Sequence, residues 1–304
     1  MLNIPDSAKI YFPHKLQPVV GTVQIIHGMA EHQGRYEEFA NYLCSNGYAV
    51  ITSDLKGHGV NVKREADLGY IGDNGAQRLV GDIHDLTKVI TERYPNVPYC
   101  LIGHGMGAIV AAAYFKKYDY FLNGLILSGM PADGAKFTDR LNARILTSAK
   151  GEYYRPHSLY NSIYGSYVGG FGKEGSPSAW LTSDPEVWEE YDRDPRCGYV
   201  YTVNGYNTYL DLLDNTYKTG SWIQKNMHVP IRIIAGSRDN LAGSKHKLAK
   251  ILTFFEDHGY DNLDAQLLKG LRHDIYNDIN SEITYDYILN ELDDIVRNYE
   301  DRAE

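Results

Sequence analysis

Side chains that could carry out acyl transfer occur in three separate segments of the chain. The segment Gly103-His104-Gly105-Met106-Gly107 follows an apolar run and precedes a run of small residues, and Asp239 and His273 come later. Acyl transfer needs an oxygen nucleophile, an imidazole that takes its proton, and a carboxylate that fixes the tautomer of the imidazole. Asp239 and His273 can supply the carboxylate and the imidazole.

The centre of the glycine-rich turn carries no nucleophile. In Gly-x-Ser-x-Gly turns the serine occupies the third position, where this chain has Gly105. The backbone there is held at positive φ, which costs about 1–3 kcal/mol for a residue with a Cβ and which glycine adopts freely. A glycine at this position therefore keeps the turn and deletes the hydroxyl.

Two backbone N–H groups are candidates for stabilising an oxyanion. Met106 follows position 105 directly, and Met29 follows the pair His27-Gly28. Donors of this kind act on the negative charge that develops on a carbonyl oxygen in the transition state. Because both groups belong to the backbone, a change of residue 105 leaves them in place.

Taken alone, Asp239 and His273 have simpler interpretations. Asp239 fits the N-cap of an apolar helix that begins near Gly243, and His273 fits a histidine in a surface loop. Their order after position 105 is the order nucleophile, acid, base of the α/β-hydrolases. This joint order favours the catalytic interpretation of both residues.

A second interpretation of the turn is a dinucleotide site. Gly103-x-Gly105-x-x-Ala108 matches the pattern Gly-x-Gly-x-x-Gly/Ala between a strand and a helix, and Asp133 follows at roughly the distance of the ribose-binding acid. However, the turn follows a third or later strand, and Asp133 comes after a Gly-Met-Pro break. A dinucleotide-binding oxidoreductase is therefore the less favoured alternative.

No metal or cofactor is expected from the histidines near the N-terminus. His27, Glu31 and His32 lack the His-Glu-x-x-His spacing that puts two imidazoles on one helix face. A structural hydrogen-bonding role is favoured for both histidines.

The elements that position these residues alternate between strands and helices. Apolar runs predict strands at about 8–12, 19–26, 48–53, 99–102, 125–127, 229–235 and 264–268. A helix is predicted at 34–46. Two more are predicted where apolar residues share one helix face, which are Leu79, Ile83, Leu86 and Ile90 in one segment and Ile288, Leu292, Ile295 and Tyr299 in the last. This alternation indicates an α/β fold with a mostly parallel sheet covered by helices on both faces. In such sheets, sites lie at the carboxyl ends of the strands.

The alternation breaks between residues 131 and 227. Tyrosines and tryptophans stand there among Gly, Pro and Ser without strand periodicity. We expect residues 131–227 to form an inserted cap, or lid, on a core domain made of residues 1–130 and 228–304. Some of these aromatic residues should line an apolar pocket above the turn.

Composition excludes several classes of partner. The 304 residues are 43% hydrophobic and 23% charged, with a net charge of −9, and no cluster of Lys and Arg suits nucleic acid or an anionic membrane. Cys44, Cys100 and Cys197 are widely spaced and odd in number, which indicates reduced thiols. Without a signal-peptide pattern or a membrane-spanning apolar run, we expect a cytoplasmic protein with no integral membrane association. Nothing in the sequence defines an oligomeric state.

Four segments carry a resemblance to a known family. The chain resembles the monoacylglycerol lipase and lysophospholipase branch of the α/β-hydrolases, the serine aminopeptidase S33-like group, over nearly its whole length. The segments are His27-Gly28-x-x-Glu31-His32-x-x-Arg35-Tyr36, Asp54-x-x-Gly57-His58-Gly59, Gly103-His104-x-Met106-Gly107 and "WLTSDPEVWEEYDRDPRCG". The resemblance implies an α/β-hydrolase fold with an inserted cap, and a small acyl ester such as a monoglyceride, a lysophospholipid or another carboxylic ester as substrate.

The resemblance also implies roles for individual residues. Position 105 is the place of the nucleophile, Asp239 the acid, His273 the base, and Met29 and Met106 the oxyanion donors. Because Gly105 departs from the family pattern, a serine-hydrolase scaffold with little or no turnover is implied. The retained acid and base favour a Ser→Gly variant of an active enzyme, and the alternative is a natural pseudoenzyme that binds an acyl ligand without cleaving it.

Overall fold

In residues 4–171, 174–218, 220 and 222–301, which the computed structural model describes, seven strands form one sheet in the order β1-β3-β2-β4-β5-β6-β7. Strand β1 pairs antiparallel with β3, and the other neighbours are parallel. The strands are β1 (Ala8–Tyr11), β2 (Gly21–Ile26), β3 (Tyr48–Ser53), β4 (Tyr99–His104), β5 (Gly124–Ser128), β6 (Ile231–Gly236) and β7 (Leu263–Leu268). The predicted strands are all present.

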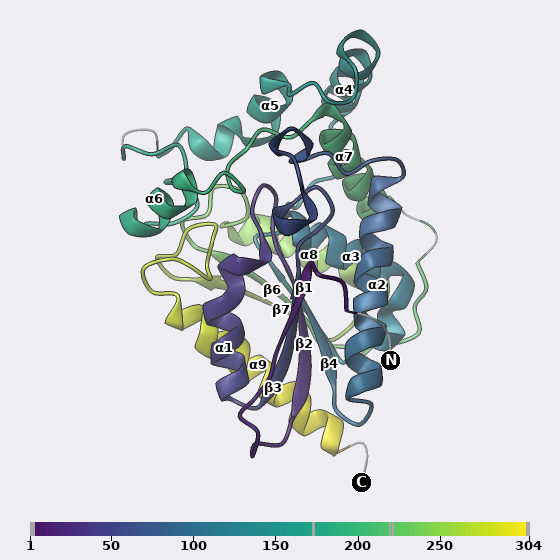
Figure 1. Cartoon of the computed structure of the whole chain (residues 1–304). Coiled ribbons are helices and arrows are strands. Elements are labelled where there is room, and N and C mark those ends of the chain that lie inside the picture. The colour runs from purple at the N-terminus through teal and green to yellow at the C-terminus, as the bar shows by residue number, and fades with distance from the viewer. Residues whose placement is uncertain (1–3, 172–173, 219, 221, 302–304) are drawn as a thin grey trace.

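Helices cover both faces of the sheet (Figure 1). One face carries α1 (Glu37–Ser45) and α9 (Glu282–Glu300), and the other carries α2 (Gly75–Arg93), α3 (Met106–Tyr118) and α8 (Lys245–Glu256). Strands β2, β3, β4 and β5 are buried at every residue because both of their faces are covered. The predicted α/β fold class is confirmed.

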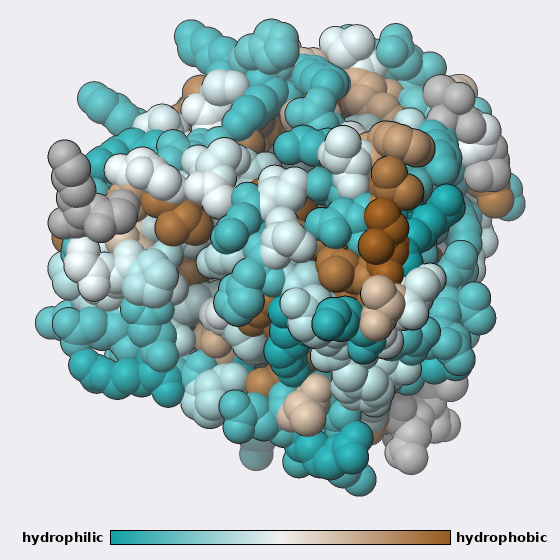
Figure 2. Space-filling view, turned by 90° about the horizontal axis from the view of Figure 1, so that it is seen from above, coloured by the Kyte–Doolittle hydropathy of each residue, from teal (hydrophilic) through white to brown (hydrophobic). Residues whose placement is uncertain are grey.

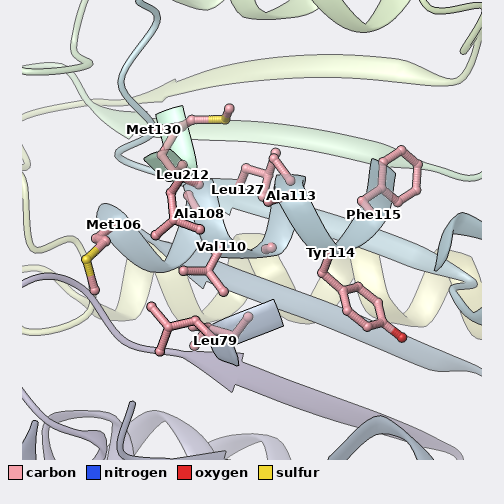
Figure 3. Packing of buried hydrophobic residues seen from close by; sticks show 14 of the residues in the cluster. Leu79, Met106, Ala108, Val110, Ala113, Tyr114, Phe115, Leu127, Met130 and Leu212 are labelled. Atoms are coloured by element: carbon pink, nitrogen blue, oxygen red, sulfur yellow. The ribbon is translucent and has the colours of Figure 1, made fainter. Parts of the chain in front are cut away.

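Helix α3 lies at the centre of the larger hydrophobic core. It is rich in alanine, so neighbouring backbones can approach it closely, and it is buried from Met106 to Lys116. Figure 3 shows Val110 of α3 beside Leu79 of α2, with Leu127 and Leu212 on its other side. This packing fixes the first turn of α3, and therefore the turn that precedes it.

The segment between β5 and β6 lies beyond the carboxyl ends of the strands (Figure 1). It carries α4 (Phe137–Lys150), α5 (His157–Val168), α6 (Pro185–Arg193) and α7 (Val203–Tyr217). Helix α7 packs on α2 and α3, and its buried leucines belong to the larger core. Leu181, Tyr191 and Cys197 form a small separate cluster. The division into a core and a cap of residues 131–227 stays a prediction.

In the described part of the chain, no helix combines the length and the apolar composition that crossing a membrane requires.

Candidate active site

The tight turn after β4 places position 105 at the entrance to α3. Gly105 has φ 55° and ψ −114°, a conformation that residues with a Cβ adopt only under strain. A Cβ on Gly103 would overlap the carbonyl group of Gly107, and a Cβ on Gly107 would overlap the carbonyl oxygen of Ile26. Glycines on both sides therefore let the helix start against the sheet and aim position 105 outward.

The structure brings Asp239 and His273 together beside this turn. Asp239 follows β6 and His273 follows β7, and the Nδ1–H of His273 donates to Asp239 Oδ2 at 2.9 Å. The second carboxylate oxygen of Asp239 accepts the N–H of Leu241 at 2.6 Å. With the proton on Nδ1, the Nε2 atom of His273 carries the free lone pair.

The free nitrogen of His273 faces position 105. A Cβ built on Gly105 would lie 3.3 Å from His273 Nε2. A side chain at this position would therefore point at the imidazole that could take its proton. Asp239 does not cap the following helix, because Ser244 is the N-cap of α8 and accepts the N–H of Lys247.

The buried environment tunes the charge of the two histidines at the site. Burial lowers the pKa of His273, but the Asp239 carboxylate outweighs this effect, and the pKa of His273 is raised above its ordinary value of 6.5. Burial favours protonation of Asp239, but the imidazole and backbone N–H groups lower the pKa of its carboxyl. Burial and the nearby His273 lower the pKa of His104 to about 4, so His104 stays neutral near pH 7.

Met29 and Met106 both lie at the cavity beside Gly105. The N–H of Gly28 donates to Glu31 Oε1. Within the described residues, the N–H groups of Met29 and Met106 have no acceptor on the protein. Met106 opens α3, where the first N–H groups have no partner inside the helix. The arrangement leaves two donors available to a bound carbonyl oxygen.

A cavity of about 390 Å³ adjoins Gly105 and His273. The indole of Trp180 stacks on the His273 ring, with centroids 4.9 Å apart. The Tyr164 hydroxyl donates to the sulfur of Met29 at 2.6 Å. The aromatic residues that line the cavity are Tyr160, Tyr164, Tyr167, Trp180, Tyr191, Tyr199, Tyr206 and Tyr209. Figure 2, which looks down on this end of the molecule, shows apolar patches set in a mostly hydrophilic surface.

A buried network of charged side chains lies next to the site and connects two of its loops. Arg35 donates through Nε to Glu31 Oε2 at 3.2 Å and through Nη2 to Asp274 Oδ2 at 2.5 Å. The Tyr36 hydroxyl donates to Glu31 Oε1 at 2.8 Å. The network thus links the loop that holds Met29 to the residue after His273. Sequence analysis did not assign these roles, although Glu31, Arg35 and Tyr36 belong to the segment that carried the resemblance.

The histidines near the N-terminus have structural hydrogen bonds. The Nδ1–H of His27 donates to the Gly28 carbonyl at 2.8 Å, and its Nε2 accepts the N–H of Leu55 at 2.9 Å. His32, Asp194 and Cys197 place possible metal-ligand atoms within 4.8 Å of one another. However, His32 Nδ1 accepts the N–H of Gly34 and His32 Nε2 bonds to Asp194. Both ring nitrogens are occupied, so we assign no metal to this group.

The described residues form an α/β-hydrolase fold. Its marks are a mostly parallel seven-stranded sheet, a tight turn after β4, and a hydrogen-bonded aspartate and histidine that follow β6 and β7. A family model described as serine aminopeptidase, S33 matches residues 17–280. The chain therefore belongs to this family, and the resemblance found in the sequence is confirmed.

The relatives and solved structures agree on this scaffold. The chain is 24% identical over 269 residues to a monoacylglycerol lipase of Mycolicibacterium smegmatis, covering 88% of this chain and 85% of the relative. It is 24% identical over 260 residues to phospholipase YtpA of Bacillus subtilis, covering 85% and 90%. A carboxyl esterase from Bacillus coagulans in complex with glycerol shares the fold with a TM-score of 0.81 at 24% identity, covering 95% of this chain and 94% of that one. The scaffold is thus of the lipase and esterase type.

Asp133, the acid of the dinucleotide alternative, is not among the residues that line the cavity beside Gly105. Its side chain is 71% exposed and pairs with Lys250. The alternative has no support from this geometry.

Proposed function

We propose that this protein is a serine-hydrolase scaffold for acyl esters such as monoacylglycerols, lysophospholipids or other carboxylic esters, in which Gly105 removes the attacking hydroxyl. The observation that carries the proposal is the direction of position 105. A Cβ there would lie 3.3 Å from Nε2 of His273, whose Nδ1 is bonded to Asp239. The likeness to lipases and esterases supports the class of substrate.

The residues take complementary roles once a serine stands at position 105. Its Oγ attacks the ester carbonyl while His273 takes the hydroxyl proton, and Asp239 holds the imidazole and stabilises its charged form. The N–H groups of Met29 and Met106 stabilise the oxyanion. His273 then gives the proton to the departing alcohol, and water hydrolyses the acyl-enzyme. The aromatic cavity holds the acyl chain away from water.

Restoring the hydroxyl tests this proposal. The Gly105→Ser protein is expected to hydrolyse p-nitrophenyl esters about 10²-fold or more faster than the parent chain, because its nucleophile lies next to a positioned base. A series of esters from acetyl to palmitoyl, followed by stopped flow, measures the initial burst and the steady rate. Absence of a burst and of turnover above the parent level for every ester would contradict the proposal.

A second candidate function follows from Gly105 itself. We propose as the alternative that the chain binds an acyl ligand without cleaving it, since the hydroxyl is missing while the cavity persists. Organic extraction of the purified protein followed by mass spectrometry tests this alternative. An intact ester bound in stoichiometric amount supports it, and recovery of no acyl compound opposes it.

Glu31 is expected to position the oxyanion donor at Met29. Its Oε1 accepts the N–H of Gly28, so it fixes the loop in which the Met29 N–H is presented. In the Gly105→Ser protein, Glu31→Gln should lower kcat about 10-fold, less than the 10²–10³-fold that loss of a donor causes, with little change in KM. Steady-state kinetics checks this split, with Glu37→Gln as the control because Glu37 pairs with Lys9 at the surface. A rise in KM at constant kcat would contradict the role.

A further inference from the structure

We propose that the chain with Gly105 hydrolyses activated acyl esters by a direct route, in which His273 deprotonates a water molecule bound beside Gly105. This inference rests on the proposed acyl-ester site and assigns that site a reaction of its own. The route needs space for water, a free base, and donors for the oxyanion.

The space beside Gly105 accepts a small group. The atoms nearest to a Cβ built there are His273 Nε2 at 3.3 Å, the Cα of Gly28 at 3.8 Å and His273 Cε1 at 3.9 Å. A water oxygen near this point would lie at hydrogen-bond distance from Nε2. Gly105 and His273 both line the cavity, so the position is open to a bound ester.

The imidazole of His273 is held in place for this task. Its Nδ1–H donates to Asp239, the indole of Trp180 covers one ring face, and Gly129 lies so close that a Cβ there would be 2.7 Å from Cε1. Among the described residues, Nε2 has no hydrogen-bond partner. The free lone pair therefore faces the open space beside Gly105.

The step balances without a covalent enzyme intermediate. The water oxygen bonds to the carbonyl carbon as Nε2 of His273 takes one water proton, and the oxyanion lies near the N–H groups of Met29 and Met106. Collapse breaks the ester C–O bond, and the imidazolium gives its proton to the leaving alcohol oxygen. The products are one carboxylic acid and one alcohol.

The pH dependence of this route follows from the groups that face His273. Asp239, Asp274 and Glu31 raise its pKa above 6.5, against the effect of burial, and His104 beside it is neutral at neutral pH. Because the free base is required, the rate should rise with pH through the raised pKa of His273. The rate should be slower in D₂O, because His273 takes a proton from water in the step that attacks the ester carbonyl.

Two variants that both lack the hydroxyl test the inference. Relative to the parent chain, His273→Ala should lower p-nitrophenyl ester hydrolysis about 10²-fold, the loss expected for a general base. Gly105→Ala should lower it about 10-fold, because the methyl group takes the place of the water that the base must reach. His228→Ala is the matched control, since His228 forms the same kind of pair with Asp261, at 2.8 Å, on the exposed surface.

The outcomes separate this inference from the proposed function. Equal rates of ester hydrolysis for the parent and His273→Ala overturn the inference. An acyl group found on His273 by mass spectrometry also overturns it, because the direct route forms no acyl-enzyme. A folded Gly105→Ala protein with the parent's rate also overturns it. If Gly105→Ala does not fold, the rate of ester hydrolysis by His273→Gln takes its place. A His273→Gln rate equal to that of the parent overturns the inference. An active Gly105→Ser protein beside a parent rate independent of His273 would leave the proposed function standing and remove this route.

Discussion

In the Gly105→Ser protein, His273→Ala is expected to lower kcat/KM about 10⁴-fold or more, because the introduced serine, His273 and Asp239 act as a unit in the proposed mechanism. The alanine removes the group that takes the serine proton and later protonates the leaving alcohol. Asp239→Asn should cause a similar loss, because the amide can no longer hold the proton on Nδ1 of His273. The double variant should be little worse than His273→Ala alone.

This result is measured by steady-state hydrolysis of a p-nitrophenyl ester, with active sites counted by a fluorophosphonate. The matched control is the surface pair His228 and Asp261, whose Nδ1–Oδ2 distance is 2.8 Å. Loss of either partner there should leave the rate unchanged. Losses that simply add for Asp239→Asn and His273→Ala would show that the two residues do not work together.

Arg35→Met is expected to cost about 3–5 kcal/mol of unfolding free energy at pH 7, the range found when one partner of a buried ion pair is removed. Arg35 is 11% exposed and pairs with Glu31 and Asp274, whose side chains are 7% and 3% exposed. The methionine fills a similar volume but leaves two buried carboxylates without their counter-charge. Urea unfolding measures the difference.

The unfolding free energy that Arg35→Met loses should be smaller at lower pH. Burial raises the pKa of Asp274, but Arg35 outweighs burial and holds it below its ordinary value. The native ion pair therefore stabilises the fold above about pH 4, the unfolded pKa, and that stabilisation disappears as pH falls through the lower folded pKa. In Arg35→Met, burial raises the pKa of Asp274 and is opposed mainly by the hydrogen bonds from Asn277, because the Arg35 charge is gone. The variant should therefore be less destabilised at pH 5 than at pH 7.

The control for this prediction is an exposed pair. Arg193 and Glu189 lie four residues apart on α6, with side chains 74% and 57% exposed, so Arg193→Met should change the unfolding free energy little. A loss for Arg35→Met no larger than that for Arg193→Met would contradict the assigned role of the buried network.

Much of the sheet was predictable because its strands are short apolar runs between turn residues. Strand β3 was predicted at its observed bounds, Tyr48–Ser53, since continuous burial leaves an uninterrupted apolar pattern. The order of position 105, Asp239 and His273 also indicated a common site. The contact between the two side chains joins residues 34 positions apart, and only the pairing of β6 with β7 brings them together.

The helices between β5 and β6 were not predicted individually. Helix α7 is buried along most of its length, from Val203 to Thr216, and its buried positions include Asn204, Thr208 and Thr216. These polar residues on the buried face obscure the apolar pattern that marks a helix in a sequence. The position of Trp180 against His273 also has no local signal, because it depends on how the chain folds back over the sheet. In the sequence, Trp180 stood out only as the first residue of the segment "WLTSDPEVWEEYDRDPRCG", which carried the resemblance.

The positive φ of Gly105 has a consequence for the heat resistance of the protein. A serine there must occupy a backbone conformation that costs about 1–3 kcal/mol, whereas the glycine occupies it freely. In the proposed Gly105→Ser enzyme, the gain in ester hydrolysis is therefore expected to come with a lower melting temperature, because one substitution acts on both properties in opposite directions.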